Sequence, residues 1–285
     1  MPTKIIDIHP HIVSEDTKRY PIAPFGGKRS DWSDERPVTF EHFISAMDEA
    51  GVDKAAIVHS STTYGFDNSY LADCVALQPK RVTGVFSVDM LAADAPEKIR
   101  YWVGRGLSGL RIFTGARNIE KRAAELDDPR FFPGWECADE LGIPVVVSVR
   151  KDGLPQLMTL IQRFPRVRII IDHMLKPPME EGEPYAGSAY LFNLAKNENV
   201  YLKLTSINVR ASMKVAGARE AFFPRLVKEF GANRIAWGSN YPASQGTLAE
   251  MVNDAKDALS SLSQEDQEWI FHRTAQLLYP VLADK

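Results

Sequence analysis

Cysteine is scarce in this chain of 285 residues. The two cysteines, Cys74 and Cys137, lie far apart in the sequence. They cannot form a disulfide framework, and no CxxC pair is present that would indicate a thiolate metal site. We therefore expect two buried thiols and a protein of the reducing cytoplasm.

Strong charge of one sign and long apolar stretches are also missing. The 34 basic and 37 acidic side chains leave a net charge of −3, which predicts no basic face and excludes nucleic acid as the expected partner. No apolar stretch reaches membrane-spanning length. The N-terminal residues MPTKIIDIHPHI lack the apolar core and cleavage site of a signal peptide. We therefore expect no membrane partner.

The sequence instead contains eight short runs rich in Val and Ile, separated by longer amphipathic segments. The runs cover residues 4–9, 54–59, 82–89, 109–113, 143–149, 167–173, 200–206 and 234–239. Their nearly continuous apolar character is typical of parallel strands that are buried on both faces. The other segments predict helices at 40–50, 68–77, 95–105, 133–141, 154–164, 189–196, 219–230, 248–259 and 264–278.

Eight alternations of strand and helix predict an α/β protein, a (β/α)8 TIM barrel with an extra C-terminal helix. A doubly wound sheet is the alternative, but it usually has a glycine-rich phosphate loop after the first strand, and this turn reads HPHIVSEDTKRY. No linker is evident, so we expect a single domain over residues 1–285. The polar loop at 14–38 would lie at the rim of the barrel and act as a lid. The outside of such a barrel is compatible with a homo-oligomer, although the sequence has no interface signature.

Polar residues follow several of the predicted strands, where TIM barrels carry their active sites. His9 and His11 stand two residues apart in an extended segment, so both point to the same side. Asp172 and His173 are adjacent at the end of the sixth run. Because successive side chains of a strand alternate, only one of these two should face the lumen, and we choose His173. Asn240 follows the eighth run.

Other polar side chains near the strand ends are candidates for binding substrate. Arg111 suits a carboxylate or a developing oxyanion, although an ion pair with Asp89 would also explain it. His59 is either a substrate contact or a structural histidine with its own partners. The substrate-binding residues that we predict are His59, Tyr64, Arg111, Ser148, Arg150, Lys176 and Arg210. Several cations near one mouth predict a small substrate with at least one carboxylate.

Three motifs at these strand ends resemble the amidohydrolase superfamily. They are DIHPHI (7–12), IDHMLKP (171–177) and GSNYP (238–242). More narrowly, they are similar to the amidohydrolase-related group of TIM barrels, which contains 2-pyrone-4,6-dicarboxylate lactonase and related lactonases. The likeness covers nearly the whole chain, including GLSGLRIF (106–113) and the tail IFHRTAQLLYPVL (270–282). It implies a hydrolase, and its motifs do not specify the substrate.

The resemblance also implies a metal site, of which this chain retains only part. The family's ligands are the paired histidines, one histidine each after strands five and six, and an aspartate after strand eight. The matching residues are His9, His11 and His173, whereas Ser148 and Asn240 stand at the other two positions. Three histidines can hold one zinc ion, but the group also has a metal-independent branch, and we favour no cofactor. Asn240 is either natural or an engineered replacement of aspartate, and the departure at Ser148 favours the natural origin.

An amide at position 240 cannot take the proton of an attacking water as a carboxylate would. Histidine titrates near neutrality, so we predict that His173, His9 or His11 takes this proton while Asn240 orients the water or binds a substrate oxygen. These four residues are the predicted catalytic set.

Three functions remain open on this basis. We favour a hydrolase that opens a lactone or similar cyclic ester of a small carboxylated substrate. The second is a metal-dependent decarboxylase or hydratase of an aromatic or unsaturated acid. The third is a non-catalytic barrel that binds small molecules.

Overall fold

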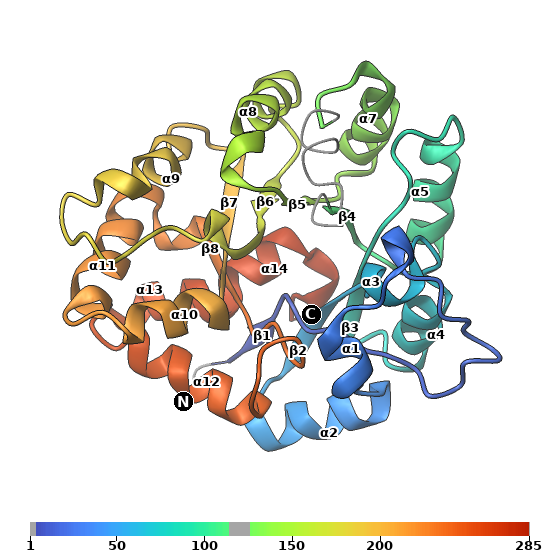
Figure 1. Ribbon diagram of the computed structural model, residues 1–285, viewed down its shortest axis with the longest axis horizontal. Helices are drawn as coiled ribbons and strands as arrows, with labels where there is room; N and C mark the ends of the chain where they lie inside the picture. Colours follow the sequence, from blue (N-terminus) through green and yellow to red (C-terminus); the bar gives the residue numbers. More distant parts are fainter. Residues whose placement is uncertain (1–3, 114–125, 285) are drawn as a thin grey trace.

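The computed structural model describes residues 4–113 and 126–284. Within them, eight parallel strands form one sheet in the order of the sequence. They are β1 (Ile6–Asp7), β2 (Lys54–Val58), β3 (Val82–Phe86), β4 (Gly109–Phe113), β5 (Val145–Ser148), β6 (Ile169–Ile171), β7 (Val200–Thr205) and β8 (Ile235–Gly238). The N–H of Ile8 donates to the carbonyl of Trp237 over 3.2 Å, which joins the two edges of the sheet. The predicted (β/α)8 barrel is confirmed, and the doubly wound sheet is excluded (Figure 1).

Most helices surround the strands on the outside of the barrel, whereas the last one lies across the end of the barrel (Figure 1). The helices are α1 (Asp31–Glu35), α2 (Phe40–Ala50), α3 (Ser61–Tyr64), α4 (Ser69–Leu77), α5 (Ala95–Gly104), α7 (Phe132–Leu141), α8 (Leu154–Arg163), α9 (Ala189–Leu194), α10 (Ser206–Met213), α11 (Ala218–Phe230), α12 (Leu248–Ala258), α13 (Gln264–Glu268) and α14 (Thr274–Leu278). Helix α10 is absent from the sequence prediction. It starts at a capping box that Thr205 and Asn208 form at the end of β7. The helix predicted at 264–278 consists of α13, a π-helical turn at Trp269–Arg273, and α14.

The C-terminal segment fills the end of the barrel at which the strands begin. Small and β-branched side chains face the lumen and pack against Tyr279 and Leu282. At Gly109, the first residue of β4, an added Cβ would lie 2.9 Å from Cε1 of Tyr279, so the ring needs this glycine. Because Tyr279 fills this end, the opposite end of the barrel is left for a ligand. No helix among the described residues has the length and apolar character needed to span a membrane.

Candidate functional site

Three histidines meet at the C-terminal end of the barrel. The ring of His9 lies 5.0 Å from that of His11 and 4.8 Å from that of His173, measured between ring centroids. Gly238 at the end of β8 allows this approach, since an added Cβ there would lie 2.6 Å from Cβ of His9. The structure thus brings together the three histidines that the sequence singles out, which we name the histidine cluster.

Asp172 and His173 both contact His9, so the expectation that only one of them faces the lumen is wrong. Oδ1 of Asp172 lies 3.3 Å from Nδ1 of His9, and the ring of His173 lies 4.8 Å from that of His9. The reason is local: β6 ends at Ile171, and Asp172–Leu175 forms a 3-10 turn in which φ of His173 is 52°. Strand alternation no longer applies beyond Ile171.

Asp172 is bound by two buried cations inside the barrel. Nε and Nη2 of Arg111 each lie 2.9 Å from Oδ2, and Nζ of Lys203 lies 2.9 Å from Oδ1. Arg111 therefore pairs with Asp172, while Asp89 is exposed. Lys203 has no role in the sequence prediction. Its position between Leu202 and Leu204 in an apolar strand was the available indication, because a lysine on the inner face of a strand needs a buried partner.

The cluster of Arg111, Asp172 and Lys203 places two cations at one carboxylate, and the buried carboxyl of Asp7 also acts on Lys203. Burial alone would raise the pKa of Asp172, but the charges of Lys203 and Arg111 outweigh it and hold that pKa well below its ordinary range. Burial lowers the pKa of Lys203, and the Asp172 carboxylate opposes this shift. One carboxylate thus faces two cations next to the histidine cluster, which disfavours protonation of the imidazoles.

His173 is held in one neutral tautomer. Its Nδ1 lies 2.8 Å from Oγ1 of Thr205, and that hydroxyl donates its single proton to Oδ1 of Asn208 over 3.2 Å. We assign the hydroxyl proton to Asn208, so that Oγ1 accepts from His173, Nδ1 carries the ring proton and Nε2 presents a lone pair. Asn208 also donates to the backbone carbonyl of His173 over 2.8 Å. Burial lowers the pKa of the half-buried His173 to about 4.

His11 and His9 are neutral as well. Nδ1 of His11 lies 2.9 Å from the carbonyl of Val58, which can only accept, so Nε2 of His11 is unprotonated. Burial lowers the pKa of His11 to about 3. Burial, followed by the charge of Lys203, moves the pKa of His9 well below its ordinary value. Nε2 of His9 is buried and has no hydrogen-bond partner among the described residues.

Asn240 is buried just after β8 in the left-handed conformation, with φ of 59°. Asparagine adopts this region more readily than most residues. Its Nδ2 donates to Oγ of Ser244 over 2.9 Å, and Ser206 donates to the same oxygen over 2.7 Å. The N–H of His11 donates to the carbonyl of Tyr241 over 2.8 Å, which ties this loop to the histidine cluster. Oδ1 of Asn240 is thus the group that can accept from a ligand.

The predicted substrate-binding residues are placed in different ways. His59 is buried with Nε2 bonded to the carbonyl of Gly65 over 2.9 Å, as expected of a structural histidine. The hydroxyl of Tyr64 accepts from the N–H of Ser14 over 2.7 Å. Arg210 lies against Asp254 at 3.1 Å and the Gln245 carbonyl at 2.6 Å.

The remaining candidates lie at the ends of β5 and β6. Ser148 is half-buried at the last position of β5, and Arg150 is exposed with Nε 3.9 Å from Asp152. Lys176 is exposed, and its N–H donates to the His173 carbonyl over 2.8 Å. Among the predicted substrate-binding residues, Lys176 is therefore an exposed cation that lies in the same turn as His173.

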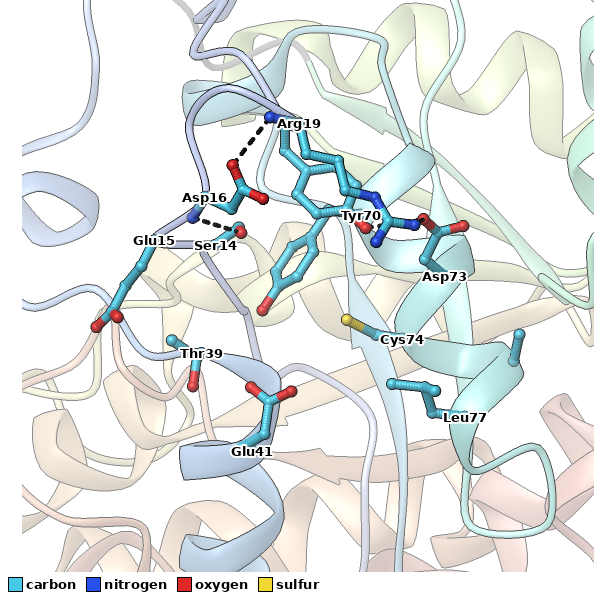
Figure 2. A pocket seen from close by; sticks show the side chains of 12 residues that line it. Ser14, Glu15, Asp16, Arg19, Thr39, Glu41, Tyr70, Asp73, Cys74 and Leu77 are labelled. Atoms are coloured by element: carbon cyan, nitrogen blue, oxygen red, sulfur yellow. Dashed lines mark hydrogen bonds and ion pairs between the residues drawn. The ribbon is translucent and has the colours of Figure 1, made fainter.

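A surface hollow of about 550 Å³ lies outside this arrangement and contains none of the histidines. It is lined by the start of the 14–38 loop, by Thr39 and Glu41, and by α4 (Figure 2). Asp73 within it is bound by Arg19 at 2.7 Å and by the Tyr20 hydroxyl at 2.8 Å. Its polar groups thus serve to attach the loop to α4.

Comparison with known proteins shows the family. The amidohydrolase family model matches residues 6–281, and the chain belongs to this family. It is 33% identical over 203 residues to L-fucono-1,5-lactonase of Burkholderia ambifaria, covering 69% of this chain and 67% of that protein. It is 25% identical over 260 residues to 4-sulfomuconolactone hydrolase of Rhizobium radiobacter, covering 90% and 82%.

Solved structures with the same fold are more distant in sequence. A protein from Pseudomonas putida assigned as a 2-pyrone-4,6-dicarboxylic acid hydrolase superposes with a TM-score of 0.78 at 20% identity, covering all of both chains. A Burkholderia multivorans amidohydrolase with bound Zn gives 0.75 at 19% identity, covering 97% and 99%. A 2,6-dihydroxybenzoate decarboxylase gives 0.68 at 15% identity, covering 99% and 100%. At these identities the likeness shows the fold alone.

The donor set that the described residues offer to a dication is small, and its carboxylate is shared with two cations. The group among the described residues that could hold a metal is His9, Asp172 and His173, with donor atoms within 4.8 Å of one another. Oδ2 of Asp172 accepts a hydrogen bond from Arg111, and Oδ1 lies at ion-pair distance, 2.9 Å, from Nζ of Lys203. A dication at this carboxylate would meet two fixed positive charges, and Asn240 offers no compensating negative charge.

Proposed function

We propose that this chain is a hydrolase that opens a small lactone or a similar cyclic ester, with His173 as general base and with no resident metal. Membership of the amidohydrolase family supports hydrolysis. The two curated relatives, named as a lactonase and a muconolactone hydrolase, support a cyclic ester as substrate. The observation that carries the proposal is the chain from His173 through Thr205 to Asn208, because it leaves Nε2 of a neutral imidazole as a proton acceptor.

The reaction would begin with a water held between Nε2 of His173 and Oδ1 of Asn240. Nε2 takes a proton while the water oxygen attacks the lactone carbonyl and forms a tetrahedral oxyanion. The ring C–O bond then breaks, and the leaving oxygen takes the proton back from His173. Lactone and water thus give one hydroxy acid, and His173 returns to its starting state.

The cluster of Arg111, Asp172 and Lys203 would stabilise the oxyanion through its two cations. These groups are fixed before the substrate arrives, so they need no reorganisation as negative charge develops. The same field favours the neutral imidazole, and His173, with a pKa of about 4, is in its basic form at neutral pH. We assign the substrate carboxylate to Lys176, the exposed cation next to the turn that carries His173.

A decarboxylase that uses a metal is the second candidate. The metal-suited group of His9, Asp172 and His173 favours it, and the engagement of Asp172 by two cations opposes it. Release of carbon dioxide from an aromatic acid, dependent on added metal, would identify this activity.

The proposal is tested by following acid release from a panel of lactones with wild type and H173Q. The panel holds sugar 1,5-lactones, muconolactones and 2-pyrone carboxylates. We expect wild type to open at least one of them and H173Q to lose about 100-fold or more in kcat. H42Q is the matched control, since His42 is exposed on α2. Wild-type turnover by H173Q would remove this residue from the mechanism, and no hydrolysis by wild type would refute lactone opening.

A further inference from the structure

The loop between β1 and α2 places a tryptophan against the histidine cluster. Trp32, in the short helix α1, stacks on the ring of His11 with 5.2 Å between ring centroids and 29° between ring planes. The indole is half-buried, so part of its apolar surface remains open while its ring packs on His11. Its position in a polar loop, twenty-one residues after His11, gave the sequence analysis no reason to select it.

This loop is attached to α3 at three points by three consecutive residues. The hydroxyls of Thr62 and Ser30 lie 2.8 Å apart, the Thr63 carbonyl accepts from the N–H of Ala23 over 2.9 Å, and the Tyr64 hydroxyl accepts from Ser14. Gly65 permits the close approach, because it has φ of 60° and an added Cβ would lie 2.7 Å from the Ala23 carbonyl oxygen. The loop is therefore fixed to the element that follows β2.

Helix α1 is too short to be stable by itself, and bonds around Ser33 hold it. Oγ of Ser33 donates to the Ser30 carbonyl over 2.9 Å, and Nε of Arg29 donates to the same Oγ over 3.2 Å. Ser33 is fully buried. Since Trp32 lies directly between Ser30 and Ser33, these bonds fix the backbone from which the indole extends over His11.

We propose that Trp32 is a substrate-contacting residue that determines specificity, and that its indole is the flat wall against which a ring-shaped lactone lies in this site. The proposal rests on the proposed function for the class of substrate. A lactone ring has an apolar face and a polar edge. The indole would cover the face, while the ester carbonyl on the edge is directed to the histidine cluster.

Removing the indole should affect binding more than chemistry, because Trp32 does not contact His173 or Asn240 in the described interactions. We expect W32A to raise KM for the preferred lactone about 10-fold or more while kcat changes much less. W32F keeps a flat ring and should retain most of the affinity. It also controls for any disturbance of the loop that the smaller side chain of W32A causes. W269F is the matched control, because Trp269 is half-buried in the C-terminal π-helical turn.

A second readout does not depend on turnover. The H173Q enzyme is titrated with a sugar 1,5-lactone and with a 2-pyrone carboxylate while tryptophan fluorescence is recorded. Of the five tryptophans, Trp32 is the one that contacts the histidine cluster. We expect binding to change the emission, and the change to disappear in H173Q/W32F but remain in H173Q/W269F.

The attachment to α3 provides a further variant that keeps the indole. T62V removes the hydroxyl that meets Ser30 and should raise KM in the same direction as W32A, whereas T159V on the exposed face of α8 should not. If W32A hydrolyses lactones with wild-type KM, the proposal for Trp32 is wrong and lactone opening stands. If lactones change the Trp32 emission but are never hydrolysed, the contact stands and the proposed function is wrong.

Discussion

Asn240 stands where the resemblance to the amidohydrolase superfamily implies an aspartate. The left-handed backbone and the bond to Ser244 make the amide part of the β8 loop. Its neutral oxygen can hold a water without adding charge. A carboxylate in the same place would stabilise protonated imidazole and so raise the pKa of the base that we assign to His173.

The replacement of this amide by a carboxylate should therefore shift the pKa of His173 in a predictable direction. His173 acts in its neutral form, so kcat/KM is lost as the pH falls through its pKa of about 4. In N240D the new negative charge raises that pKa, and the acid limb of the pH profile should move up by about one pH unit. The fold should be kept, because Ser244 can turn its hydroxyl to donate to the carboxylate.

N240S is the neutral control for this variant. It should be slower than wild type but should keep the acid limb where it is. An acid limb that stays in place in N240D, or a variant that becomes faster on binding stoichiometric zinc, would contradict the role that we give to the amide.

At the scale of single elements, the start of α10 holds the side chain of His173, the base that we propose. Thr205 ends β7, begins α10 through its capping box with Asn208, and accepts from Nδ1 of His173. The tautomer of His173 is thus fixed by the start of a helix. Loss of the Thr205 hydroxyl should impair proton transfer more than substrate binding.

We expect T205V to lower kcat about 10-fold or more with little change in KM. The variant also loses a helix cap, at about 1 kcal/mol of folding stability, so T205S serves to separate the two effects. T205S restores the hydroxyl and should recover most of the rate. If T205V and T205S have the same kcat, the hydroxyl does not orient His173.

The sequence predicted the elements that depend on local pattern and missed those that depend on a turn. Runs of Val and Ile predicted all eight strands, and the spacing of His9 and His11 predicted that they converge. The 3-10 turn after Ile171 could not be predicted, because alternation holds only while the strand continues. Helix α10 was missed because its capping pair follows a strand without a break.

Two further residues gained their roles only in three dimensions. Lys203 is one lysine among the 34 basic residues until Asp172 and Arg111 are seen around it. Trp32 reaches His11 because α3 holds the loop at three points, and no sequence periodicity reports such contacts. The sequence pattern thus predicts the strands and the polar residues at their ends. The electrostatics of the site depend on ion pairs between different strands, which the sequence pattern does not predict.

At the scale of the whole molecule, the barrel holds two buried cations, Arg111 and Lys203, beside the carboxyl groups of Asp172 and Asp7. Tyr279 fills one end, the buried cluster of Arg111, Asp172 and Lys203 lies in the interior, and the neutral histidines lie above it. This arrangement places fixed cations directly beside the histidine cluster. We therefore expect lactone opening to proceed without a bound metal ion.

The most direct test is the initial rate of lactone opening by protein whose metal content has been measured before and after treatment with a chelator. The account predicts a metal content well below one ion per chain and the same rate in both samples. A rate that disappears on chelation and returns with added zinc would contradict it.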